Sequence, residues 1–193
     1  MKIFKFSLVI FFFTISFPLD KTYVLDIEFR GNSNIQNNEL KDVLRLKGKS
    51  FMSTTEFKSN KLNLDLIAIK SLYKSRGYLD VEIDYSYQYT DRSNVSIEFI
   101  IIEGFRYKIR NISISGNKSF QDDYILESIK LESEYYNPSY IRNQLINLKN
   151  EYLRIGKINI SINEEVVIED QFIDLFIYIS EGNKFYIEDI LIS

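Results

Sequence analysis

The sequence IEFRGN at residues 27–32 recurs as ISISGN at residues 112–117, and this recurrence decides the fold. In both copies alternating apolar residues lead into a Gly-Asn pair, and an apolar residue followed by Gln comes three residues after the Asn. Alternation of this kind is typical of a β-strand, and Gly-Asn is typical of a turn. Gly31 and Gly116 lie 85 residues apart. We therefore predict two copies of one structural unit, each opening on a strand.

Each copy then contains two predicted helices. The apolar positions of the first helix are Leu40, Val43 and Leu44 in one copy and Ile125 and Ile129 in the other. Those of the second helix share the spacing i, i+4, i+7, i+11, which marks one face of a helix. They are Leu62, Leu66, Ile69 and Tyr73, then Ile141, Leu145, Leu148 and Tyr152. Gly77 and Gly156, each four residues after the Tyr, predict a left-handed helix end.

The second helix is predicted to begin differently in the two copies. Residues 53–56, Ser-Thr-Thr-Glu, fit a capping box, in which the Ser hydroxyl and the Glu carboxylate satisfy free amides of the first turn. In the other copy Asn137 precedes Pro138, which is a capping residue followed by a proline at the first helical position. We expect the two helices to start at these points.

Two further strands are predicted to close each unit. The second strand alternates strictly, and its apolar residues are Leu79, Val81, Ile83, Tyr85 and Tyr87 in one copy and Ile158, Ile160 and Ile162 in the other. The third strand, at Phe99–Ile102 and Phe172–Ile179, is apolar on both faces, which is typical of a central strand. Turns at 90–94 and 164–171 are predicted to join the second and third strands as hairpins.

The pattern of each copy is β-α-α-β-β, which predicts an α+β fold of tandem repeats. We expect each repeat to form a three-stranded mixed sheet covered on one face by two antiparallel helices, with domains at residues 23–104 and 105–182. Residues 183–193 align without a gap on residues 105–115 and are predicted to form the first strand of a truncated third repeat. The chain is therefore expected to be part of a longer protein.

The first 19 residues have the layout of a secretory signal peptide. Met1–Lys5 is basic, Phe6–Leu19 is mostly apolar, and the first acidic residue is Asp20. The apolar run is shorter than the roughly 20 residues of a comfortable membrane span. An uncleaved anchor and a plain buried segment are the alternatives to a cleaved signal.

The composition excludes several classes of function. The 193 residues include no Cys, no His and no Trp, which removes disulfides, thiolate nucleophiles, Cys-based zinc sites and the usual general base. The net charge of −3 argues against non-specific nucleic-acid binding, which needs a basic surface. Carboxylate chemistry remains open, because Asp80, Glu82 and Asp84 form an acidic ladder, although solvated charges that protect a sheet edge explain it better.

The combined motifs resemble the POTRA repeat, the polypeptide-transport-associated domain. The features in common are the strand ending in Gly-Asn, the leucine-rich second helix, the segment Leu72–Tyr78 that leads into the second strand, and the closing Glu-Gly at residues 103–104 and 181–182. The resemblance covers residues 23–193. Tandem POTRA repeats look like the periplasmic arm of the outer-membrane assembly factors of the BamA family, in which the arm precedes a membrane β-barrel.

The resemblance implies a binding role rather than an enzymatic one, with no cofactor, metal or nucleic acid. It implies unfolded outer-membrane proteins and accessory assembly lipoproteins as partners, on the periplasmic side of the bacterial outer membrane, with membrane attachment through a barrel that this chain lacks. A two-partner secretion transporter or a TamA-like translocation factor is the alternative. A division protein of the FtsQ type fits less well, because it has one such domain behind a true anchor, and an exported carboxylate enzyme would need converging acids.

The resemblance also implies a site. The second strand would be a sheet edge at which an extended client peptide pairs by β-augmentation. The residues at this edge are Leu79, Val81, Ile83, Tyr85, Ile158, Ile160 and Ile162. Their side chains are expected to lie mostly in the core, so that the backbone carries the function and the groove beside the second helix accepts client side chains. Tyr85, Tyr87 and Tyr89 are expected to cover the helix side of the strand.

Overall fold

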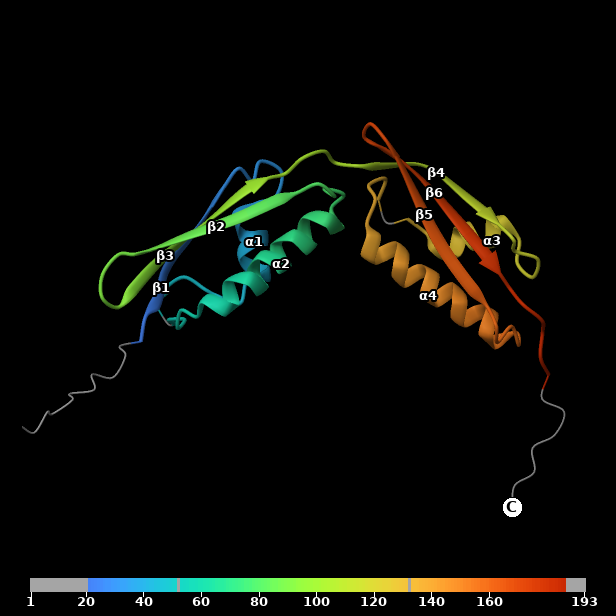
Figure 1. Cartoon of the computed structure of the whole chain (residues 1–193), viewed down its shortest axis with the longest axis horizontal. Helices are drawn as coiled ribbons and strands as arrows, with labels where there is room; N and C mark the ends of the chain where they lie inside the picture. Colours follow the sequence, from blue (N-terminus) through green and yellow to red (C-terminus); the bar gives the residue numbers. More distant parts are fainter. Residues whose placement is uncertain (1–20, 52, 132, 187–193) are drawn as a thin grey trace, which may run out of the picture.

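The computed structural model describes residues 21–51, 53–131 and 133–186, which form two similar units (Figure 1). The first unit comprises β1 (Tyr23–Arg30), α1 (Asn37–Val43), α2 (Ser59–Ser75), β2 (Glu82–Tyr89) and β3 (Asn94–Ile102). The second comprises β4 (Lys108–Ser115), α3 (Asp122–Ile129), α4 (Pro138–Arg154), β5 (Ser161–Glu169) and β6 (Phe172–Ser180). The predicted signal peptide and residues 187–193 of the predicted third repeat lie outside the described residues.

Both sheets have the same order, and the third strand of each unit is central as predicted. The first sheet runs β1-β3-β2 and the second β4-β6-β5. The outer pairs β1–β3 and β4–β6 are parallel, whereas β2–β3 and β5–β6 are antiparallel hairpins. Figure 1 shows the helices of each unit on one face of its sheet. The predicted α+β fold, with a mixed sheet and one helical layer, is confirmed.

The core of each unit lies between the sheet and its long helix. Along β3, Val95, Ile97, Phe99 and Ile101 are buried against the helices, and the residues between them face the opposite side. On α2 the buried residues are Leu62, Asp65, Ile69 and Tyr73. Each fully buried large apolar side chain contributes about 1.5–3 kcal/mol relative to an exposed one. The predicted helix face is therefore correct except at Leu66, whose place in the core is taken by Asp65.

Asp65 is buried, and its carboxylate accepts hydrogen bonds from two backbone amides just after α1. Its two carboxylate oxygens accept hydrogen bonds from the amides of Arg45 (2.7 Å) and Leu46 (3.1 Å), just after α1 ends. A buried amide without a partner costs about 1–3 kcal/mol, so the carboxylate fixes the path of this loop. Apolar periodicity alone does not reveal such a residue.

The predicted capping box at residues 53–56 is wrong, because this segment is extended rather than helical. The Thr55 carbonyl accepts a hydrogen bond from the Val24 amide (2.9 Å), and Glu56 forms an antiparallel bridge with Tyr23. Pairing with β1 therefore outweighs capping, and α2 begins at Ser59. The prediction for α4 is confirmed, since Asn137 Oδ1 accepts from the Tyr140 amide (3.1 Å) ahead of Pro138.

The predicted turn at residues 164–171 is also wrong, because β5 continues to Glu169. The alternation of the strand persists through this segment, and its residues pair with β6 up to Glu169 and Phe172. Only Asp170 and Gln171 remain for the turn, and Asp170 adopts a φ of 55°. A pair of residues joining antiparallel strands is a common hairpin connection. The acidic residues at 164, 165 and 169 therefore lie on an edge strand, not in a loop.

The Gly-Asn motif closes each unit onto its last strand. Gly31 has a φ of +88°, and a Cβ added to it would lie 2.1 Å from the Ile101 carbonyl oxygen. Gly116 has a φ of +84° and the same distance to the carbonyl oxygen of Ile179. Both positions therefore require glycine. The following Asn donates from Nδ2 to the carbonyl three residues later, which fixes the turn that leads to α1 or α3.

The closing Glu-Gly motif completes this arrangement. The Glu103 carboxylate accepts hydrogen bonds from the Asn34 amide (2.9 Å) and the Tyr73 hydroxyl (2.9 Å). Glu181 accepts from the Ser119 amide (2.6 Å) and forms an ion pair with Lys157 (2.9 Å). Each carboxylate thus links the end of the central strand to the Gly-Asn loop, and through Tyr73 or Lys157 to the long helix or the turn after it.

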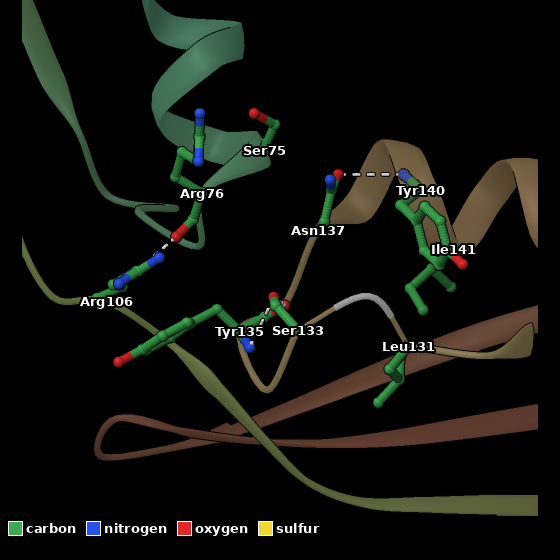
Figure 2. A pocket seen from close by; sticks show the side chains of 9 residues that line it. All are labelled: Ser75, Arg76, Arg106, Leu131, Ser133, Tyr135, Asn137, Tyr140 and Ile141. Atoms are coloured by element: carbon green, nitrogen blue, oxygen red, sulfur yellow. Dashed lines mark hydrogen bonds between the residues drawn. The ribbon is translucent and has the colours of Figure 1, made fainter. Parts of the chain in front are cut away.

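The two units meet where the chain passes from one to the next (Figure 2). The Tyr107 amide donates to the Gly77 carbonyl (2.9 Å), and its hydroxyl donates to the Asp80 carboxylate. Arg106 Nε donates to the Arg76 carbonyl (2.8 Å), and the guanidinium lies 3.4 Å from the centre of the Tyr135 ring. These contacts connect the C-terminal end of α2 to the loop ahead of α4.

Candidate functional site

The outer edges of β2 and β5 are open. Each strand forms backbone pairs with the central strand of its sheet on one side. Within residues 21–51, 53–131 and 133–186, no strand or bridge pairs with the other side of either. Such an edge presents a row of backbone donors and acceptors to an incoming strand.

The opposite edges of the two sheets are partly closed by the protein itself. The Lys49 amide donates to the Leu25 carbonyl (2.9 Å), beside the contact between Val24 and Thr55 already described. In the second unit the Ile109 amide donates to the Glu134 carbonyl (2.9 Å), and Lys108 bridges to Tyr135. Loops therefore cover part of β1 and β4, which leaves β2 and β5 as the candidate binding edges.

The direction of the backbone groups on β2 follows from Tyr85. Its amide donates to Oδ1 of the neighbouring Asp84 (2.8 Å), so it points away from β3 and toward the open edge. Backbone direction repeats every second residue along a strand. The amides of Ile83 and Tyr87 therefore face the open edge as well. Glu164 pairs with Ile177 of β6 as Tyr85 pairs with Phe99 of β3. The backbone amides of Glu164, Val166 and Ile168 therefore face the open edge of β5.

Three of the seven residues predicted at the edges lie in the edge strands, namely Ile83 and Tyr85 in β2 and Ile162 in β5. The other four precede these strands and are Leu79, Val81, Ile158 and Ile160. The strands start later than predicted because the chain turns after each long helix. One contact of this turn is the Ile160 amide donating to the Lys157 carbonyl (3.2 Å). Val81 and Ile160 are buried core residues.

Aromatic side chains lie on the helix side of β2. Tyr85 donates its hydroxyl to Asn63 Oδ1 on α2 (3.2 Å). Tyr87 packs against Phe57, with 5.0 Å between ring centres. Ile67 lies one helical turn beyond Asn63 and is exposed. The tyrosines cover the helix side of the strand, as predicted.

The helix side of β5 has a different character, because Glu164 stands at the position that corresponds to Tyr85. One carboxylate oxygen of Glu164 is buried and has no hydrogen-bond partner in the described structure. Burial raises the pKa of the nearby Tyr136 hydroxyl to about 12, the charge of Glu164 adds to this, and Arg142 opposes it. The helix side of β5 is therefore polar at Glu164.

Leu79 is a residue of the first unit that contacts the second unit. Its side chain packs against the core of the second unit, although it follows α2 of the first. It also lines a hollow of about 470 Å³ that reaches Val166 on β5. Its counterpart Ile158 remains 57% exposed. The repeat offset identifies the two as equivalent, but the contact across the units carries no signal in the sequence.

The described residues show neither a metal site nor a membrane-spanning helix. Within the described ranges no cluster of three or more acidic side chains is arranged to hold an ion. No helix there is long and apolar enough to span a bilayer. In the predicted acidic ladder, Asp80 accepts the Tyr107 hydroxyl and Glu82 is exposed.

Comparison with known families and proteins points in one direction. The model of the POTRA family, described as "Surface antigen variable number repeat", matches residues 22–104 and 107–182. The outer membrane protein assembly factor BamA of Buchnera aphidicola subsp. Acyrthosiphon pisum is 30% identical over 201 residues, covering 91% of this chain and 32% of that protein. BamA of Neisseria meningitidis serogroup B is 34% identical over 127 residues, covering 63% and 15%. The chain thus spans less than a third of the length of both relatives, whose names describe assembly factors.

Solved structures show the same fold. POTRA domains 3–5 of Haemophilus influenzae BamA superpose with a TM-score of 0.62 at 18% identity, over 88% of this chain and 70% of that one. BamA of Haemophilus ducreyi lacking POTRA domains 1–3 gives 0.51 at 19% identity, over 86% and 30%. At these identities the likeness concerns the arrangement of strands and helices.

Proposed function

Because the chain belongs to the POTRA family and carries tandem POTRA domains of the BamA type, we propose that it is the periplasmic arm of an outer-membrane protein assembly factor. In this proposal the arm receives unfolded β-barrel proteins, and each client adds an extended strand to the open edge of β2 or β5. Accessory assembly lipoproteins are further partners. The role is binding rather than catalysis.

The observation that carries this proposal is the contrast between the two edges of each sheet. Loops pair with part of β1 and β4, whereas no strand of the described residues pairs with the outer edges of β2 and β5. Main-chain hydrogen bonds do not depend on the client's side chains, which suits a receptor for many clients. Asp84, whose carboxylate accepts from the Tyr85 amide, places a charge at the edge that discourages self-association.

Proline substitution tests the edge directly. We expect Tyr87→Pro and Ile168→Pro to weaken binding of a ten-residue peptide with alternating polar and apolar residues, because each removes an amide that faces the open edge. Tyr87→Ala and Ile168→Ala are the matched controls, since they lose the same side chain but keep the amide. Fluorescence anisotropy of a labelled peptide measures affinity, and circular dichroism verifies the fold.

A peptide that binds the proline and alanine variants equally well would contradict pairing at that strand. Loss of binding in both variants of a pair would assign the interaction to the side chain rather than to the backbone. The double variant Tyr87→Pro/Ile168→Pro shows whether the two edges together account for all binding.

A further inference from the structure

The open edge of β5 borders a hollow that both units line. Leu79 and Lys74 contribute to it from the first unit. The second unit contributes Tyr136, Pro138, Arg142 and Val166. At about 470 Å³ the hollow has room for a large side chain.

The position of Val166 connects the hollow to the edge. Its side chain lies on the helix side of β5 and lines the hollow, while its amide faces the open edge. Neighbouring strands lie about 4.8 Å apart, so a strand added to β5 passes along the mouth of the hollow. Every second side chain of that strand points toward the helix layer.

The chemistry of the lining favours an aromatic guest. Leu79, Pro138 and Val166 provide apolar walls, and burial of a large apolar side chain among them stabilises the complex. Lys74 and Arg142 are exposed at the hollow and carry positive charge. Cations of this kind are attracted to the face of an aromatic ring but gain nothing from an aliphatic chain.

We propose that the β5 edge and this hollow form one composite site, which selects client strands with an aromatic side chain at the helix-facing position opposite Val166. The proposal rests on the proposed function, because strand pairing with β5 brings the side chain to the hollow. It makes the first unit part of the binding site of the second.

The β2 edge lacks this preference in our proposal. The residue equivalent to Val166 there is Tyr87, an aromatic residue whose ring packs against Phe57. The two edges therefore differ in selectivity although their backbones are alike. A client strand without an aromatic residue pairs with either edge, whereas an aromatic residue directs it to β5.

The test compares two labelled ten-residue peptides of alternating Thr and Val, in which one central Val is replaced by Phe or by Ala. Their affinities for the full chain are measured by fluorescence anisotropy. We expect the Phe peptide to bind about tenfold more tightly than the Ala peptide, as burial of one large apolar side chain predicts. In Leu79→Ala, and in Ser71→Phe, which fills the hollow from the exposed face of α2, this ratio falls toward one.

Ile158→Ala is the matched control, because Ile158 is the repeat counterpart of Leu79 and is exposed; it keeps the tenfold ratio. Equal affinities of both peptides for the unchanged protein, or a ratio unaffected by both Leu79→Ala and Ser71→Phe, would overturn the composite site. Failure of the proposed function gives a different result, since neither peptide would then bind at all.

Discussion

Glu181 holds together three parts of the second unit with one buried carboxylate. Burial works to raise its pKa, but hydrogen bonds from Ser119 and Lys118 and the ion pair with Lys157 outweigh it and hold the pKa at about 2. An unfolded Glu titrates near pH 4.3, at about two units higher. The resulting stabilisation is complete above about pH 4.3 and is lost as the pH falls toward 2.

Glu181→Gln is therefore expected to lower the free energy of unfolding by roughly 2–3 kcal/mol at pH 7. The loss relative to the unchanged protein shrinks at pH 3, because Glu181 is then mostly protonated in the unfolded chain but still ionised in the folded one. Urea unfolding at both pH values measures it. Glu169→Gln is the control, because Glu169 forms an exposed pair with Arg110 and such pairs contribute less than about 1 kcal/mol. An equal loss at both pH values would contradict the assignment.

Gly116 is expected to tolerate no side chain. Gly116→Ala strains a residue at φ +84° and pushes a Cβ toward the Ile179 carbonyl oxygen, so we expect a loss of more than about 2 kcal/mol. Gly48→Ala is the matched control, since the nearest atom to its added Cβ lies at 3.4 Å and its φ is outside the left-handed region. Thermal unfolding followed by circular dichroism compares them. Similar losses in both variants would show that the close approach at Gly116 relaxes freely.

The two long helices begin in different ways, and a substitution at the start of each helix measures the difference. Asn137→Ala removes the side-chain acceptor at the start of α4 and should cost about 1 kcal/mol. Ser53→Ala removes a hydroxyl that forms an exposed hydrogen bond with the Ser50 hydroxyl, so its effect should stay within about 0.5 kcal/mol. Urea unfolding of both variants is the measurement. A larger effect at Ser53 than at Asn137 would contradict the observed start of α2.

The elements were predictable where a local pattern determines them. Period-two alternation located the outer strands of both sheets, and continuous apolar runs located the central strands β3 and β6. The apolar faces located the helices, because such a face reports burial on one side. The sequence of residues 53–56 satisfies the local rule for a cap, but pairing with β1, thirty residues earlier, takes these backbone groups instead. Glu164 and Leu79 show the same limit at the candidate site, since their roles depend on neighbours from another strand or another unit. Local periodicity does not reveal contacts with another strand or another unit.

The joint between the units determines whether the hollow beside β5 exists at all. Leu79 reaches the second core only while the first unit is held against the second by Tyr107, Asp80 and Arg106. Interfaces between domains of one chain leave relative motion possible unless specific bonds restrict it. A looser joint should therefore leave both sheets folded and both edges open, yet remove the selectivity proposed for β5.

Tyr107→Phe tests this coupling, because it deletes only the hydroxyl that donates to Asp80. The chain contains no cysteine, so spin labels at Asn60→Cys and Lys149→Cys, both exposed on the long helices, report the distance between units. We expect a broader distance distribution and a Phe-to-Ala peptide affinity ratio that falls toward one, with unchanged affinity for the Ala peptide. Tyr178→Phe, which deletes an exposed hydroxyl bonded within the second unit, should change neither. A broader distribution with an intact ratio would mean that the first unit does not shape the site.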